Sequence, residues 1–170
     1  AMFGLPETFL QITLVENLIG SYRWLWSLSE ILHFTGLILL VGIISIYDLR
    51  LLGIGKRIPV AALNRLLPWA VFGFCLCVLT GLLFVTGLWA NVKTHPMEAL
   101  VYDHFLQIKL AFIVFAGLNL LFMHKSGMAT AVDELGPGDE APALARVIAA
   151  SSLVLWLGVV YFGRLVPWGL

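Results

Sequence analysis

The chain has 170 residues, of which 61% are hydrophobic and 12% are charged, and its mean hydropathy is +0.98. Such a composition excludes a water-soluble globular domain. Its 10 basic and 10 acidic residues cancel, so there is no net field to attract nucleic acid, and we expect no polynucleotide partner.

The first segment, residues 5–20, has apolar residues at helical spacing with Glu7 and Glu16 between them. This pattern predicts a helix that lies in the membrane interface. The segment lacks the basic start, the continuous apolar centre and the small-residue cleavage site of a signal peptide. We therefore expect it to remain in the mature protein.

Four further segments are apolar over the roughly 20 residues that a membrane-spanning helix needs. They predict an all-α fold, with residues 1–170 forming one integral membrane domain. We expect a four-helix bundle in a lipid bilayer, preceded by the interfacial helix. The expected spans are 24–47, 66–90, 99–124 and 147–166.

The third span is preceded by Thr94, Pro96 and Glu98, which form a plausible capped helix start with proline in the first turn. We therefore expect this helix to begin near Pro96 and to continue unbroken to His124. At 1.5 Å per residue it would be roughly 43 Å long, so its first turns would protrude from the hydrocarbon core.

The loop charges predict the orientation, because basic residues of short loops stay preferentially in the cytoplasm. Six basic residues lie in the loops after the first and third spans, whereas the opposite side has Arg23, Lys93 and Arg164. This asymmetry predicts that both termini lie outside, which in a bacterial inner membrane is the periplasm. Four tryptophans at the outer span ends fit an aromatic belt: Trp24, Trp26, Trp89 and Trp168.

His33 lies nine residues after Trp24, roughly 13 Å into the first span. An ionisable side chain at this depth is costly and indicates a function. Gly36 follows nearly one turn later on the same face, where the missing side chain lets a flat ring or a neighbouring backbone approach. His33 is therefore a candidate axial ligand of haem iron. The alternative is a histidine that hydrogen-bonds Glu30 or another helix.

His104 is the candidate for the second axial ligand. It lies eight residues after Pro96, roughly 12 Å along the expected third helix, and thus at a depth similar to that of His33. The alternative places His104 at the interface as an ordinary amphipathic residue. His124 is roughly 30 Å further along the same helix, so we expect it at the cytoplasmic end, near the helix C-terminus.

Lys109 and Arg164 lie in the outer thirds of their helices and are candidates for pairing with haem propionates. The alternatives are ion pairs with Glu30 and Asp103 or, for Arg164, a side chain that extends to the interface.

The remaining intramembrane groups have simpler expectations. Asn119 is expected to form an interhelical hydrogen bond. Cys75 and Cys77 lie in one apolar run and are rotated roughly 200° from each other on a helix, which favours neither a disulfide nor a metal site. We expect the sulfur atoms of Cys75, Met97 and Met123 to serve packing.

Several short motifs cover nearly the whole chain: His33-Phe34-Thr35-Gly36, Tyr47-Asp48-Leu49-Arg50-Leu51-Leu52-Gly53, Leu67-Pro68-Trp69, Thr80-Gly81, Ile108-Lys109, Ala116-Gly117-Leu118-Asn119 with His124, Trp156-Leu157-Gly158 and Gly163-Arg164. As a set, they resemble a bacterial family of small four-span membrane proteins whose activity is not established. This sequence departs from the family at His104, where other members often have an Asn-Pro pair. The histidine followed by glycine three residues later is also loosely similar to b-type cytochrome subunits and copper-resistance membrane subunits, a likeness of fold alone.

Three functional hypotheses follow from these residues. The first is a b-type cytochrome subunit that binds haem b and carries single electrons between a periplasmic redox protein and the quinone pool. The second is a cofactor-free anchor or assembly subunit of a larger complex. The third is a copper permease with a polar path over Glu30, His33 and His104. The chain has no phosphate-binding loop, nucleophile elbow or metalloprotease histidine pair, so we expect any catalysis on a partner subunit.

Overall fold

A computed structural model describes residues 10–169, in which helices joined by loops are formed and no β-strand occurs. The predicted all-α fold is confirmed. Residues 5–9 of the expected interfacial helix lie outside the described part, and α1 forms much of the remainder. The elements in chain order are α1 (Thr13–Ser21), α2 (Trp24–Leu51), α3 (Val60–Asn64), α4 (Leu67–Thr86), α5 (Leu88–Val92), α6 (Pro96–Tyr102), α7 (His104–Lys125), α8 (Met128–Asp133), α9 (Ala143–Leu165) and the 3₁₀ turn η1 (Val166–Trp168).

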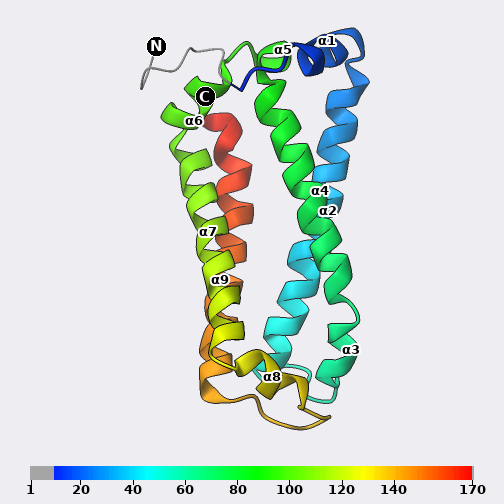
Figure 1. The fold of residues 1–170 in the computed structure, drawn as a ribbon, viewed down its shortest axis with the longest axis vertical. Helices are drawn as coiled ribbons and strands as arrows, with labels where there is room; N and C mark the ends of the chain where they lie inside the picture. The colour runs from blue at the N-terminus through cyan, green and yellow to red at the C-terminus, as the bar shows by residue number, and fades with distance from the viewer. Residues whose placement is uncertain (1–9, 170) are drawn as a thin grey trace.

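Four helices, α2, α4, α7 and α9, are long and apolar enough to cross a membrane. The longest, α2, has 28 residues and a length of roughly 42 Å. The chain is therefore a multi-pass membrane protein. The four helices run along the long axis, with α1, α5, α6 and the C-terminal turn at one end and α3 and α8 at the other (Figure 1). We call these the terminal end and the loop end; which of them faces the cytoplasm stays a prediction.

The four helices form two antiparallel hairpins rather than a closed square. α2 packs most extensively on α4, and α7 on α9, while α2 and α9 form the main contact between the two pairs. Their antiparallel order follows from the short connections at the loop and terminal ends, as Figure 1 shows. The α2–α9 contact is thus the seam that joins the two hairpins.

Glycines allow the closest helix crossings. A Cβ atom built on Gly36 would lie 2.7 Å from the carbonyl oxygen of Gly73, and one built on Gly73 would lie 2.6 Å from that of Gly36. No larger residue fits at either position unless α2 and α4 separate. In the other hairpin, the ring of Phe112 fills the space beside Gly158. Close approach over small residues is the usual way in which membrane helices associate.

The prediction of an unbroken third helix from Pro96 to His124 is wrong. α6 begins at Pro96, as predicted, but it ends at Tyr102, and Asp103 is extended with φ −78° and ψ 97°. The buried Asp103 carboxylate accepts a hydrogen bond from the backbone N–H of Leu106 at 3.0 Å and so caps the start of α7. His104 is therefore the first residue of a membrane-spanning helix, instead of lying roughly 12 Å along one.

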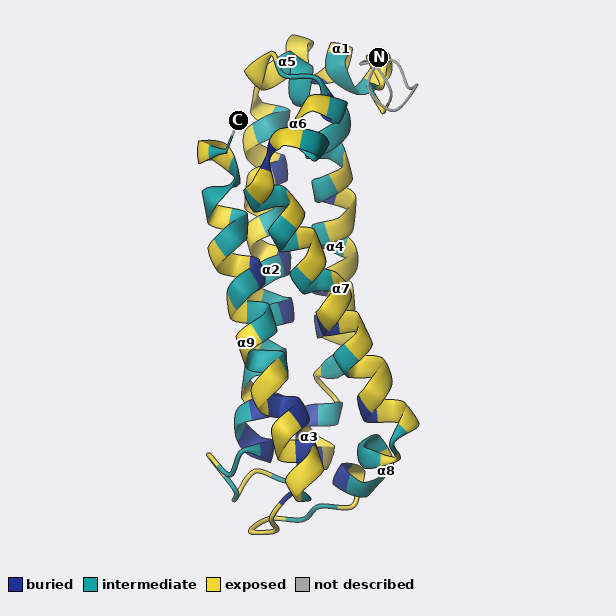
Figure 2. Cartoon of the chain, turned by 90° about the vertical axis from the view of Figure 1, so that its left-hand side faces the viewer, coloured by how far each residue is buried: buried dark blue, intermediate teal, exposed yellow. Residues whose placement is uncertain are grey.

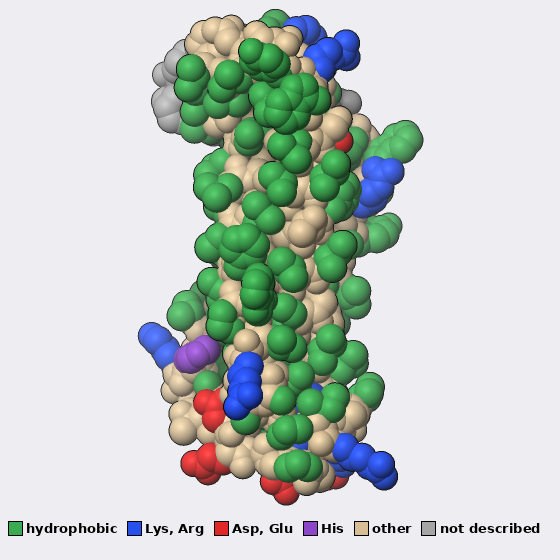
Figure 3. Space-filling model, turned by 90° about the vertical axis from the view of Figure 1, so that its right-hand side faces the viewer, with side chains coloured by type: hydrophobic (Ala, Val, Ile, Leu, Met, Phe, Trp, Pro, Cys, Tyr) green, Lys and Arg blue, Asp and Glu red, His purple; other side chains and the backbone are tan. Residues whose placement is uncertain are grey.

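The most deeply buried apolar residues lie at the loop end, close to α3 and α8 (Figure 2). Elsewhere most outward-facing side chains are apolar, and hydrophobic side chains cover the middle of the face in Figure 3, while charges gather mainly toward its lower end. Such a surface suits lipid contact around the middle of the molecule. The core residues are Leu51, Val60, Met123, Val132, Ala141, Ala145, Ile148 and Ala149.

Candidate functional site

His33 is held between the two helices of the first hairpin. Its ring is half-buried, and Nδ1 lies 2.7 Å from the hydroxyl oxygen of Thr80 on α4. The rings of His33 and Phe84 have centroids 5.3 Å apart, and Trp26 lies against the same phenylalanine at 5.1 Å. Two hydrogen-bond partners were considered for His33, Glu30 and another helix. The structure shows the bond to another helix, α4, and not to Glu30.

The Thr80 hydroxyl group fixes which nitrogen of His33 carries the proton. Thr80 has a single hydroxyl proton, and its oxygen also lies 2.7 Å from the carbonyl oxygen of Leu76. A carbonyl can only accept, so the hydroxyl donates to Leu76 and accepts from His33. This places a proton on Nδ1, so that a neutral imidazole would have its lone pair on Nε2.

Gly36 lies on the side of α2 that meets α4. The backbone of Gly73 and the sulfur atom of Cys77 cover it, so a neighbouring helix, and not a flat ring, occupies the space that the missing side chain leaves. Gly81 leaves space beside His33 itself, because a Cβ built there would lie 3.9 Å from Cε1 of the imidazole.

Lys109 brings a basic group from the second hairpin toward His33. Its stem packs on Gly163 of α9, where a built Cβ would lie 3.3 Å from the Cε atom of the lysine. Its ammonium group is within electrostatic range of the His33 imidazole and the Cys77 thiol. Within residues 10–169, Lys109 takes part in no ion pair. His33 and Lys109 are thus the two predicted site residues that the fold brings into one neighbourhood.

His104 and Arg164 have different surroundings. His104 is exposed at the first position of α7, as the interface alternative for this residue expected. Arg164 is exposed in the last turn of α9, where its stem can carry the charge toward the interface. The ion pairs considered for Lys109 and Arg164 with Glu30 and Asp103 do not form in the described part of the chain.

The other intramembrane polar groups are mostly engaged. Asn119 donates from Nδ2 to the carbonyl oxygen of Ile148 on α9 at 3.1 Å, so the predicted interhelical hydrogen bond is confirmed. Nδ1 of His124 lies 3.0 Å from the carbonyl oxygen of Leu120, in the last turn of α7. Glu30 is exposed and accepts a hydrogen bond from the Trp26 indole at 3.0 Å.

The sulfur and acidic groups form no evident metal site. Cys75 and Cys77 are free thiols, Cys75 exposed and Cys77 half-buried. No three histidine, cysteine or acidic residues come together in a group that could hold a metal ion, as far as residues 10–169 show.

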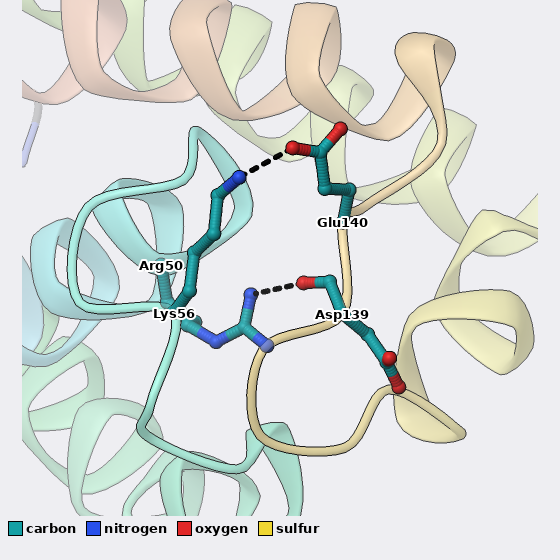
Figure 4. Close-up of polar contacts among 4 residues, drawn as sticks. All are labelled: Arg50, Lys56, Asp139 and Glu140. Atoms are coloured by element: carbon teal, nitrogen blue, oxygen red, sulfur yellow. Dashed lines mark hydrogen bonds and ion pairs between the residues drawn. The ribbon is translucent and has the colours of Figure 1, made fainter.

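Sequence reasoning missed a set of contacts at the loop end. The buried guanidinium of Arg50 donates to three backbone carbonyl groups, those of Ile58 at 2.7 Å, Gly136 at 3.0 Å and Asp139 at 3.2 Å. Figure 4 shows Arg50 facing the loop before α9. Arg50 lies three residues beyond the predicted end of the first span, and nothing in its spacing indicates these distant carbonyl partners.

Lys56 pairs with Glu140 beside Arg50, between the same two loops (Figure 4). The hydrogen bond and the charge of Lys56 lower the pKa of the exposed Glu140 carboxyl. The backbone N–H of Gly138 also donates to the carbonyl oxygen of Lys56 at 2.8 Å. The loop after α2 and the loop before α9 therefore form one connected structure.

A second unpredicted cluster lies at the terminal end. The His95 and Trp89 rings stack with centroids 4.4 Å apart and an interplanar angle of 17°. Nδ1 of His95 lies 3.3 Å from Oε1 of Gln11, and Nε2 of the same amide donates to the Glu16 carboxylate of α1 at 2.9 Å. His95 is thus half-buried, and the cluster fastens α1 to the segment between α5 and α6.

Comparison of the chain with protein-family models, with curated proteins and with solved structures finds no significant match. The class of the protein therefore rests on its own four membrane-length helices.

Proposed function

We propose that this chain is a membrane-embedded b-type haem subunit in which His33 is an axial ligand of the iron. The observation that carries the proposal is the hydrogen bond from Nδ1 of His33 to Thr80, which leaves the Nε2 lone pair for a metal. Metal-binding histidines almost always donate their other ring N–H in this way, because it fixes the ring and increases its basicity. When bound, haem would supply one-electron chemistry between a periplasmic redox protein and the quinone pool.

The packing around His33 favours one direction for the haem. The α2–α4 crossing is closed at Gly36 and Gly73, so a porphyrin cannot enter between these helices there. The opposite direction leads toward the second hairpin and Lys109, whose ammonium group would pair with a propionate. Arg164, next to the glycine on which Lys109 packs, is the second candidate for a propionate.

The described fold supports only one histidine ligand in this proposal. His104 is exposed at the start of α7, and α2 and α7 share no extensive contact among residues 10–169. His33 and His104 were expected to be a pair of axial ligands because they would lie at equal depth along two helices. That expectation assumed a continuous third helix, so we do not include His104 in the proposal.

The test is the absorption spectrum of the purified full-length protein. We expect a Soret band and, after reduction with dithionite, an α band typical of b-type haem. His33→Ala should abolish both bands. His124→Ala, which changes an exposed histidine at the far end of α7, should leave them unchanged. A coloured His33→Ala protein with an unaltered Soret band contradicts the ligand assignment.

The second candidate is a cofactor-free anchor or assembly subunit. It is favoured by the hydrogen bonds of His33 between α2 and α4 and of Asn119 between α7 and α9, since interhelical hydrogen bonds give such residues a structural role. A colourless protein that folds stably, from cells supplied with haem, supports this function. The copper-permease hypothesis has the least support, because Glu30 and His104 are both exposed and Glu30 is bonded to Trp26.

A further inference from the structure

Asp48 is a buried acid at the seam between the two hairpins. It lies in the last turn of α2, with 6% of its surface exposed. On the opposite side of the seam it faces the hydroxyl group of Ser152 on α9. Its Oδ2 atom is buried and has no hydrogen-bond partner among the described residues.

Among residues 10–169, no positive charge offsets an ionised Asp48. The nearest basic residue in the sequence, Arg50, directs its N–H groups to three backbone carbonyls, and Lys56 is paired with Glu140. Arg146 is six residues before Ser152 on α9, roughly 9 Å along that helix, and is exposed. The other basic side chains of the loop end are also exposed: Arg57, Arg65 and Lys125.

The remaining titratable groups around the seam cannot neutralise Asp48 either. Tyr47 precedes it on α2, and Asp133 ends α8, within electrostatic range of Tyr47. Both side chains are neutral or negative, so neither compensates a buried carboxylate. The amide of Asn64 on α3 donates to Asp133 at 2.9 Å.

The helix dipole adds to the penalty. The last turn of a helix carries partial negative charge, which disfavours an anion there. Asp103 is also buried and has an unpartnered Oδ2 atom, but it lies at the N-terminus of α7, where its other oxygen accepts a backbone N–H bond. Asp48 has no such backbone donor, and its place in the last turn of α2 disfavours an ionised carboxylate.

We propose that Asp48 is a proton-binding site, an un-ionised carboxylic acid at neutral pH whose bound proton holds the two hairpins together at the α2–α9 seam. Burial of an unpaired carboxylate costs more than binding a proton, so the folded chain retains the proton. Release of the proton to water would leave a negative charge between α2 and α9. Because these helices form the main contact between the hairpins, that charge would loosen the seam. The inference does not depend on whether His33 binds haem.

Infrared spectroscopy of the full-length protein in lipid tests the protonation state directly. At about pH 7, where a free aspartic acid with a pKa of about 3.9 is ionised, we expect the carbonyl stretching band of an un-ionised carboxylic acid. Asp48→Asn should remove this band. Glu134→Gln, which changes an exposed acid at the same end, should retain it. Absence of the band in the wild type, or its survival in Asp48→Asn, overturns the proposal.

Ser152→Ala keeps the acid and removes the hydroxyl group that faces it. We expect the band to persist at a shifted frequency in this variant, because the surroundings of the carboxyl group change. This variant provides the test if Asp48→Asn fails to fold. A band that does not shift in Ser152→Ala shows that the acid lies elsewhere and contradicts the assignment.

Hydrogen exchange tests the coupling to the seam. As the pH is raised above about 7, where the proposed acid is still un-ionised, protection factors of the last turns of α2 and the first turns of α9 should fall in the wild type and stay constant in Asp48→Asn. Equal behaviour of the two proteins over this range overturns the claim that the proton holds the hairpins together.

Discussion

Thr80 makes a histidine tolerable inside a membrane span, because it satisfies the imidazole N–H in a region without water. Thr80→Val keeps the shape of the side chain and removes the acceptor, leaving Nδ1–H unsatisfied between α2 and α4. We expect the variant to lose about 1 kcal/mol of unfolding free energy, the usual range for interhelical hydrogen bonds in membranes. Reversible unfolding in mixed micelles measures the change.

Thr35→Val is the matched control for this prediction. Thr35 is exposed on α2 and donates only to the carbonyl oxygen of Ile31 in its own helix. Its replacement should leave the unfolding free energy nearly unchanged, because valine removes no interhelical partner. Equal losses in the two variants would mean that the Thr80–His33 contact adds nothing to stability.

Helix pairing in the first hairpin depends on the crossing of Gly36 and Gly73. Gly36→Ala places a methyl group against the backbone of α4, so the helices must separate and the packing around His33 is lost. We expect a destabilisation of about 1–3 kcal/mol, as for other overpacked interiors. Gly42→Ala, on the same helix with nothing within 4 Å of the added Cβ, should be neutral or stabilising. Unfolding curves of both variants decide this, and a Gly36→Ala protein as stable as Gly42→Ala contradicts it.

Hydropathy predicts the spanning helices, but it does not predict where each one begins. Pro96 was identified as a helix start, yet the same helical pattern continues through Asp103 and hides the second start at His104. Aspartate is a preferred N-cap, so Asp103 directly before an apolar run was the available signal. The missed break makes His104 the first residue of its helix, whereas the expected equal depth of His33 and His104 assumed a helix that began at Pro96.

The pairing of the helices cannot be derived from this sequence. In a membrane, side chains that face lipid and those that face another helix are both apolar, so the usual contrast between a buried and a solvated face is missing. The long-range partners are then set by local shape and single polar groups. Thr80 is 47 residues from His33, and Asn119 is 29 residues from Ile148. Only the presence of an amide in the third span could be interpreted beforehand, and its predicted interhelical bond is confirmed.

Arg50 ties the two hairpins together at the loop end, since it belongs to α2 and binds carbonyl groups of the loop before α9. Arg50→Met keeps much of the side-chain volume and leaves the carbonyl groups of Ile58, Gly136 and Asp139 without their donor. Hydrogen bonds to a charged group contribute about 1.5–3 kcal/mol each, and the buried Arg50 makes three of them, so we expect a loss of roughly 3 kcal/mol or more. Thermal unfolding and limited proteolysis within residues 134–142 measure the effect.

The control is Arg57→Met, because Arg57 is exposed in the loop after α2. Each variant removes one positive charge from the loop end. Any general effect of this charge on how the protein interacts with the membrane surface is therefore common to both variants. Arg50→Met should be cut faster than Arg57→Met in the loop before α9, since only Arg50 holds that loop. Equal cleavage rates in the two variants would contradict this prediction. They would mean that the apolar core stabilises the loop end without Arg50, and that the exposed Lys56–Glu140 pair adds only a weaker contribution.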